Sequence, residues 1–342
     1  MAKPILGIDI GYSQLKLVLM TGNKVKKAVT VPMPERLLRE GRVVSTESMS
    51  ELLRQTIKEN GLRCRQAALV IPRELSYVRS VTMPQMTADQ LLYNLPYEFR
   101  DYITDELKNY IFDYAMISTP EDMQEGGKPQ DRGENETDGE ANAPTMDLLA
   151  AAVSREYIEE VTGMIRKAGM KLVKAAPPIC AYIPFIRKLD AGEKKEYCLL
   201  DIGQKSIRMY MFHGECHEVS REIEIGMETI EQAIADQYNV DIHLAHTYLL
   251  TNHEDCRKQP VCTDLFERIG IELMRALHFY EFSNPDRTIT DIWVSGGGCG
   301  ITGLLDAISE NTGKVIHPAE ELIDDIGEDA FNYVQAAGIC LE

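Results

Sequence analysis

The fold of this chain is decided near the N-terminus by the stretch Ile8-Asp9-Ile10-Gly11-Tyr12-Ser13-Gln14-Leu15-Lys16-Leu17. Two short apolar runs flank a polar turn, a pattern that predicts a strand, a tight turn and a second strand. The other half of the chain opens with a second copy, Leu200-Asp201-Ile202-Gly203-Gln204-Lys205-Ser206-Ile207-Arg208-Met209. A pattern that returns in the same context indicates an internal duplication.

Each copy has the composition of an anion site. Glycine lets backbone approach a ligand closely, and successive N–H groups of such a turn form a concave anion site. Asp9 and Asp201, at the strand ends, cannot bind phosphate directly but can hold a hydrated divalent cation that does. Two such turns facing each other would grip a polyphosphate from both sides. The alternative is that Asp-Ile-Gly is a chance tripeptide in two ordinary hairpins.

A third glycine-rich turn follows the apolar run Ile292-Trp293-Val294. It reads Ser295-Gly296-Gly297-Gly298, and a helix is expected from about Ile301. A strand followed by glycines and a helix allows a flat ring to lie against bare backbone, with the helix N-terminus nearby. We therefore expect this turn to hold the adenosine end of a nucleotide.

The composition is that of an ordinary globular protein. The chain has 342 residues, of which 44% are hydrophobic and 26% charged, and its net charge is −18. This sign disfavours nucleic acid and, at long range, an anionic membrane surface. No apolar run approaches the ~18–20 residues of a membrane helix, and the N-terminus does not resemble a signal peptide. We therefore expect a cytosolic protein with no direct membrane insertion.

The remaining strands and helices follow from apolar periodicity. In the first half the predicted strands are Ala67–Ile71, Val78–Met83, Phe112–Ile117 and Leu148–Val153, and the predicted helices are Leu91–Tyr102 and Arg155–Ala168. In the second half the predicted strands are Glu196–Ile202 and Ile207–Phe212, and the predicted helices are Glu228–Tyr238 and Asp264–Phe282. Residues 120–144 are rich in Gly, Pro and acids, and we expect a flexible surface insertion there.

The three glycine motifs resemble those of the actin/Hsp70/sugar-kinase ATPase superfamily. Within it, the sequence is most similar to the PilM family of type IV pilus assembly proteins, relatives of the division protein FtsA. Leu95-Pro96-Tyr97-Glu98 and Ala336-Ala337-Gly338-Ile339 also look PilM-like. The resemblance implies an α/β, two-lobed actin-like ATPase fold of duplicated ribonuclease H-like domains, with an FtsA-type inserted subdomain. The implied boundaries are 1–74 plus 169–190 for subdomain 1A, 75–168 for inserted subdomain 1C, and 191–342 for the second lobe, with subdomain 2B at about 227–288.

The resemblance also implies ATP and Mg as ligands. Lys16 would reach the phosphates, Asp9 and Asp201 would hold magnesium through water, and Gly226 would lie near the sugar. The full set of expected nucleotide-binding residues is Asp9, Gly11, Tyr12, Ser13, Gln14, Lys16, Asp201, Gly203, Gln204, Lys205, Ser206, Gly226, Gly296, Gly297 and Gly298.

Three departures from the family pattern predict weak nucleotide binding and slow or absent hydrolysis. Many relatives open the connecting helix with Glu-Pro, and that Glu helps to activate water. This chain reads Pro177-Pro178-Ile179 at the same place, so the acid is missing. A general base must lie within hydrogen-bond reach of the proton that it accepts, and no other carboxylate in this segment can take that role. The second turn carries Gln204 and Lys205 instead of small or hydroxyl residues. The Glu-x-x-Lys contact to the nucleoside is replaced by His246-Thr247-Tyr248-Leu249. No catalytic residue is assigned, and whether the protein is an enzyme stays open.

By resemblance the protein is a scaffold of a type IV pilus or related type II secretion machine. It would bind the N-terminal peptide of a PilN-type membrane protein and so lie at the inner face of the cytoplasmic membrane through partners, with the motor ATPase and platform protein as further contacts. Alternatives are an active ATPase, a small-molecule kinase and an FtsA-like filament protein. The residues expected in the peptide groove are Leu75, Tyr77, Val78, Leu95, Tyr97 and Phe99.

Overall fold

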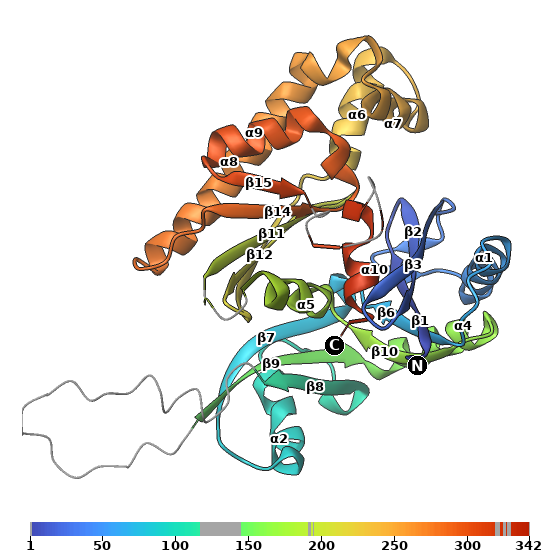
Figure 1. Ribbon diagram of the computed structural model, residues 1–342, viewed down its shortest axis with the longest axis vertical. Coiled ribbons are helices and arrows are strands. Elements are labelled where there is room, and N and C mark those ends of the chain that lie inside the picture. The colour runs from blue at the N-terminus through green and yellow to red at the C-terminus, as the bar shows by residue number, and fades with distance from the viewer. Residues whose placement is uncertain are drawn as a thin grey trace, which may run out of the picture. The chain divides into compact units, whose positions relative to one another are not determined.

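The computed structural model describes residues 2–116, 145–190, 193, 195–318, 322–323, 326 and 330–341 (Figure 1). It divides into two compact units, one made of Met1–Ile71 with Met164–Glu342 and the other of Pro72–Gly163. The second unit overlaps the segment 75–168 expected to be inserted. The acidic segment 120–144 lies outside the described residues.

The first unit contains two five-stranded sheets with the same arrangement. The strand order of one is β10-β6-β1-β2-β3 and of the other β15-β14-β11-β12-β13. In each, the central strand pairs antiparallel with the strand that follows it along the chain and parallel with a later one. The predicted duplication therefore extends to the whole sheet.

The bounds of β1, β2, β6, β11, β12 and β14 follow the predicted apolar runs closely, whereas no strand was predicted at the positions of β3, β10, β13 and β15. The first sheet consists of β1 (Pro4–Ile10), β2 (Gln14–Thr21), β3 (Lys24–Pro32), β6 (Gln66–Val70) and β10 (Lys171–Ala176). The second consists of β11 (Glu196–Ile202), β12 (Ile207–His213), β13 (Cys216–Ile223), β14 (Asp291–Ser295) and β15 (Val315–Pro318). A separate pair is formed by β4 (Leu38–Arg39) and β5 (Arg42–Val43).

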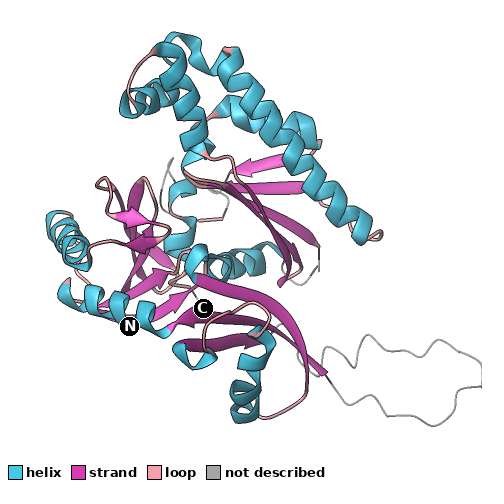
Figure 2. Cartoon of the chain, turned by 180° about the vertical axis from the view of Figure 1, so that it is seen from behind, coloured by secondary structure: helices cyan, strands magenta, loops and turns pink. Residues whose placement is uncertain are grey.

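Helices flank the second sheet. Cys198, Leu200 and Val294 point into one core with Leu273 and Leu277, because alternate residues of a strand share a face. Figure 2 shows the long helices α8 and α9 side by side on this side of the sheet. The helices of the first unit are α1 (Thr46–Glu59), α5 (Pro178–Asp190), α6 (Met227–Tyr238), α7 (Ile242–Thr251), α8 (Pro260–Ser283), α9 (Thr302–Thr312) and α10 (Val334–Gly338). None of the described helices is long and apolar enough to cross a membrane.

The short helix α10 is packed tightly between β1 and α5 by two glycines. A Cβ added at Gly7 would lie 1.7 Å from the carbonyl oxygen of Ala336, and one at Gly338 would lie 1.9 Å from that of Ala181. Real Cβ atoms do not approach so closely, so only glycine allows these backbones to touch. This packing fixes the C-terminal segment against the first sheet.

The second unit is a three-stranded sheet with a small helical layer. Its strand order is β7-β9-β8, and its elements are β7 (Ser76–Pro84), α2 (Ala88–Asn94), the 3-10 helix η2 (Leu95–Phe99), β8 (Tyr110–Met116), β9 (Thr145–Ser154) and the start of α4 (Arg155–Lys167). The continuous helix predicted over Leu91–Tyr102 is wrong. The α-helix ends at Asn94 because Pro96 has no N–H to donate, and the chain continues as η2.

Candidate nucleotide-binding site

The two Asp-Ile-Gly turns are closed by the same hydrogen bond. The N–H of Gly11 donates to the carbonyl of Gln14 at 3.0 Å, and the N–H of Gly203 donates to that of Ser206 at 3.1 Å. A Cβ at either glycine would lie 3.0 Å from that same oxygen. The repeat seen in the sequence is thus a repeat of backbone geometry.

The two turns also meet within the first unit. The ammonium nitrogen of Lys205, in the second turn, lies 5.8 Å from the centroid of the Tyr12 ring in the first. Asp201 is close enough to Lys16 and Asp9 for both charges to act on its pKa. The turns therefore face each other, as a polyphosphate clamp requires, and do not lie on opposite outer surfaces.

Each aspartate stands opposite a cation on the neighbouring strand. Asp9 pairs in register with Lys16, and Asp201 pairs with Arg208. The Lys16 ammonium lies 3.6 Å from a carboxylate oxygen of Asp9, and both side chains are largely buried. The predicted phosphate-contacting lysine is thus held beside the predicted metal-holding carboxylate.

Asp201 belongs to a hydrogen-bond network that sequence reasoning missed. The Gln335 side-chain amide donates to Asp201 at 2.8 Å and to the Tyr182 hydroxyl at 3.0 Å. Burial raises the pKa of Asp201, while Lys16 and Arg208 oppose this rise. Gln335 directly precedes Ala336-Ala337-Gly338-Ile339, so the family-like ending was the available signal for it.

Side chains of the second turn contact carboxylates. The Gln204 amide donates to the buried Glu231 at 2.7 Å, and Lys205 forms an ion pair with Glu228. The Ser206 hydroxyl donates to Glu222 at 2.6 Å. The side chains of Gln204, Lys205 and Ser206 are therefore all turned toward carboxylates of the protein. In the first turn, Ser13 is exposed while Tyr12 and Gln14 are half-buried.

Gly226 joins the second turn to α6. It is buried, and a Cβ there would lie 2.4 Å from the carbonyl oxygen of Gln204. The next two N–H groups donate to the turn, Met227 to Gly203 at 3.1 Å and Glu228 to Gln204 at 2.9 Å. Gly226 thus allows α6 to begin directly against the turn.

The glycine-rich turn after β14 has one open position between two crowded ones. Gly296 has φ 95°, and a Cβ there would lie 2.6 Å from the carbonyl oxygen of Ile202. A Cβ at Gly298 would lie 2.1 Å from the side chain of Ile202. A Cβ at Gly297 would meet nothing within 4 Å. Gly297 is therefore the position of this turn with room for a ligand.

The residues predicted for the peptide groove all lie in the second unit, but they differ in exposure. Tyr77 and Tyr97 are exposed, and Leu75 and Val78 are partly buried. Leu95 and Phe99 do not fit the predicted role. Both are wholly buried in the core of this unit, so they have no surface to offer a partner.

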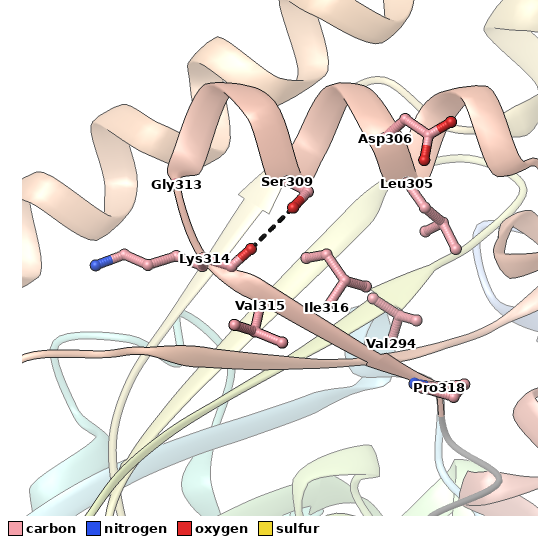
Figure 3. Close-up of a pocket in the computed structure, with 9 residues that line it drawn as sticks. All are labelled: Val294, Leu305, Asp306, Ser309, Gly313, Lys314, Val315, Ile316 and Pro318. Atoms are coloured by element: carbon pink, nitrogen blue, oxygen red, sulfur yellow. Dashed lines mark hydrogen bonds between the residues drawn. The ribbon is translucent and has the colours of Figure 1, made fainter.

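A separate cavity of about 680 Å³ lies beside α9 and β15 (Figure 3). Leu305, Val294 and Ile316 gather between helix and strand, while the Lys314 ammonium points away. None of the predicted nucleotide-binding residues lines it. Among the described residues, no group of three or more His, Cys, Asp or Glu side chains could hold a metal ion. The expected magnesium site therefore has two carboxylates, Asp9 and Asp201, and no third protein ligand of these types from the residues that the structure describes.

The model of the family described as Type IV pilus assembly protein PilM matches residues 7–128 and 135–325. The chain belongs to the PilM family. No curated protein matches the sequence. The PilM-type resemblance drawn from the three glycine motifs is thereby confirmed, and the protein is a type IV pilus assembly protein of the actin-like class.

Solved structures agree with the PilM assignment in fold. The chain is similar to a PilM-PilN type IV pilus biogenesis complex, with a TM-score of 0.79, 22% identity, and 98% of this chain and 97% of that chain covered. It is similar to the ethanolamine utilization protein EutJ from Carboxydothermus hydrogenoformans, with a TM-score of 0.59, 14% identity, and coverage of 98% and 88%. It is also similar to MreB5 of Spiroplasma citri bound to ADP, with a TM-score of 0.53, 12% identity, and coverage of 98% and 94%. The predicted actin-like ATPase fold of this PilM-family chain is confirmed.

Proposed function

We propose that this PilM-family protein is a cytosolic, ATP-binding scaffold of a type IV pilus assembly machine. It binds the N-terminal peptide of a PilN-type inner-membrane protein and connects that protein to the pilus motor. The observation that carries nucleotide binding is the meeting of two identically closed turns, joined by Lys205 and Tyr12. A similar structure with bound ADP, MreB5 of Spiroplasma citri, supports the same ligand class.

The residues of the site fit Mg-ATP. Gly297 offers open backbone for the adenosine end, since a Cβ there meets nothing within 4 Å. The two turns would hold the phosphates through backbone N–H groups, helped by Lys16 and Lys205. Asp9 and Asp201 would hold hydrated magnesium, which neutralises phosphate charge.

Hydrolysis is expected to be slow or absent. The expected general base would stand at the start of α5, but this helix begins with Pro178 and Ile179. The one acid of α5 is Asp190, at its opposite end. The side chain that contacts Asp201 from the C-terminal segment is an amide, Gln335, which cannot accept a proton as a general base does. ATP then acts as a structural ligand that stabilises the native state.

Calorimetry with Mg-ATP tests nucleotide binding directly. Gly297→Glu should abolish binding without lowering the melting temperature, because its side chain enters the open space proposed for the adenosine end. Gly163→Glu is the matched control, since a Cβ at Gly163 also meets nothing within 4 Å and lies outside the site. Equal affinities in both variants would refute the placement. A phosphate-release assay beside Asp9→Ala separates a scaffold from an active ATPase.

The surface of the second unit that best suits a peptide is aromatic. Tyr93, Tyr97 and Tyr102 are 72%, 43% and 54% exposed. The guanidinium carbons of Arg100 and Arg79 lie 4.3 Å and 4.6 Å from the ring centroids of Tyr97 and Tyr102. Exposed tyrosines held by arginines have the composition of interaction hot spots. The similarity to a PilM-PilN complex supports a PilN-type occupant.

Fluorescence anisotropy with a labelled N-terminal PilN-type peptide tests this surface. Tyr93→Ala combined with Tyr97→Ala should weaken binding by about thirtyfold or more, since such anchors contribute over ~1 kcal/mol each. Phe282→Ala is the control, because Phe282 is 87% exposed on α8 in the other unit. A peptide that binds the double variant as well as the wild type would exclude this surface.

A further inference from the structure

Positive charge is concentrated in the segments that build the first sheet. Residues 1–34, 60–73 and 161–189 contain fourteen Lys and Arg but a single acid, Asp9, in a chain whose net charge is −18. These segments supply all five strands of that sheet. The strands themselves contain six of these cations, all lysines, and Asp9 as their one acid, so they carry a net positive charge.

Several of these cations gather at one end of the sheet. Lys171 opens β10, and its N–H donates to the carbonyl of Arg65, just before β6, at 2.8 Å. Lys3 precedes β1, and Lys24 opens β3, whose partner β2 ends beside it. Five strands about 4.8 Å apart give a row of about 19 Å. We call this end the basic pole and define it as Lys3, Lys24, Arg63, Arg65 and Lys171.

The side chains of the basic pole are free to bind an external anion. All five residues are exposed. No carboxylate in the described part of the chain lies within ion-pair distance of any of them, whereas Lys16 and Lys205 are both paired. An unpaired, exposed cation can bind a ligand without first breaking an ion pair.

The pole also contains a hollow lined by cations. A cavity of about 450 Å³ is bordered by Lys3, Arg63 and Arg65, with Pro4, Cys64 and Gln66. The Cys64 Sγ lies 3.0 Å from the carbonyl oxygen of Pro4 and 2.8 Å from that of Gln66, so its one S–H has two acceptors within reach, and this contact holds the loop before β6 in place. Three cations around one fixed hollow suit a phosphate group better than a single surface lysine does.

We propose that the basic pole docks on an anionic phospholipid surface. A row of long, unpaired cations about 19 Å wide matches many headgroups at once and requires no fixed partner geometry. A protein partner is instead held by aromatic or apolar anchors in pockets, and no aromatic side chain lines this hollow. Charges more than a Debye length away, about 8–10 Å, are screened, so acids beyond that distance weaken the pole little. This contact is independent of nucleotide and of a PilN-type peptide.

Vesicle co-sedimentation of the purified full chain, without partners or nucleotide, tests the proposal. The probes are phosphatidylcholine vesicles with and without 30% phosphatidylglycerol, at low and at physiological salt. Arg63→Glu with Arg65→Glu is the test variant, and Lys258→Glu with Arg268→Glu is the control with the same charge change on exposed residues outside the pole. Each cation near an anionic leaflet is worth about fivefold in partitioning, so the test variant should bind at least ~25-fold more weakly than the wild type.

The control should bind within about twofold of the wild type, and Arg63→Lys with Arg65→Lys should retain binding. Circular dichroism melting curves confirm that all variants are folded. Wild-type protein that does not sediment with phosphatidylglycerol vesicles, or a test variant that binds like the control, would overturn the proposal. A labelled ten-residue polyglutamate peptide is the second probe. Pole-dependent binding to this peptide without binding to vesicles would overturn the lipid assignment in favour of an acidic protein partner.

Discussion

Lys205 of the second turn lies over the ring of Tyr12 in the first, with its ammonium nitrogen 5.8 Å from the ring centroid. The same ammonium pairs with Glu228 at the start of α6. A cation in this turn can either attract a phosphate or occupy its place. Glu228 thus holds the ammonium beside both turns, and in the proposed site a phosphate would compete with this carboxylate for it.

Replacing this cation should weaken nucleotide binding without destabilising the fold. Lys205→Met is expected to lower Mg-ATP affinity about tenfold, because the attraction of the ammonium for phosphate, ~1–4 kcal/mol at 4 Å, is partly offset by loss of its pair with Glu228. The melting temperature should stay within about 2 °C, since an exposed ion pair contributes little to stability. Calorimetry and a thermal melt measure the two effects. Lys258→Met is the control, because Lys258 is also exposed and pairs with Asp255. Tighter ATP binding by Lys205→Met would mean that the lysine takes the place of phosphate.

Replacing Asp201 by a neutral residue should have opposite effects on the stability of the protein and on nucleotide binding. Its pKa is raised by burial, so keeping it ionised at neutral pH destabilises the folded state. Asp201→Asn removes that charge and can still accept the hydrogen bond from Gln335. We expect a melting temperature about 1–3 °C higher without nucleotide, and loss of magnesium-dependent ATP binding. A lower melting temperature would show that attraction to Lys16 and Arg208 outweighs burial.

The glycine-rich turn predicts a sharp contrast between neighbouring positions. Gly296→Ala should destabilise the protein by about 2–4 kcal/mol, because it adds backbone strain at φ 95° and places a Cβ 2.6 Å from the Ile202 carbonyl oxygen. Gly297→Ala should change stability by less than about 1 kcal/mol, because its Cβ meets nothing within 4 Å. Urea unfolding of the two variants measures the difference. Similar midpoints would contradict the backbone conformation described for this turn.

The duplicated turn could be predicted because its motif is local, and the resemblance of the three glycine motifs to a known superfamily then implied the two-lobed fold. Each Asp-Ile-Gly turn, with its flanking strands, is encoded within about ten consecutive residues. The same locality failed for Leu91–Tyr102, where apolar spacing suggested one helix and Pro96 ended it.

The partners of the site residues could not be predicted from the sequence in the same way. Gln335 reaches Asp201 over a separation of 134 residues, and Glu231 reaches Gln204 over 27. No periodicity encodes such contacts, because they depend on where α10 and α6 pack. Leu95 and Phe99 show the same limit, since an apolar residue that lies in the core cannot be distinguished by type from one at an interface.

Glu231 connects the second turn to the surface of α7. One of its carboxylate oxygens accepts from Gln204 at 2.7 Å, and the other lies 2.6 Å from Nδ1 of His246. The Glu231 side chain is 3% exposed, whereas that of His246 is 41% exposed. The hydrogen bond to Glu231 raises the pKa of His246, although burial opposes it. A protonated His246 therefore stabilises the buried carboxylate that orients Gln204.

This pair should make stability depend on pH in a defined direction. A histidine whose pKa is higher in the folded state adds stability that is fully present below its ordinary pKa of 6.5 and is lost as pH rises through the folded value. His246→Gln should therefore lower the urea midpoint at pH 5.5 but leave it nearly unchanged at pH 8.5. The difference should stay below about 1 kcal/mol, since the ring is partly solvated. His243→Gln is the matched control, because His243 pairs with Glu35 but both side chains are 72% exposed. An equal loss at both pH values would assign His246 a packing role, and the orientation of Gln204 would then not depend on its charge.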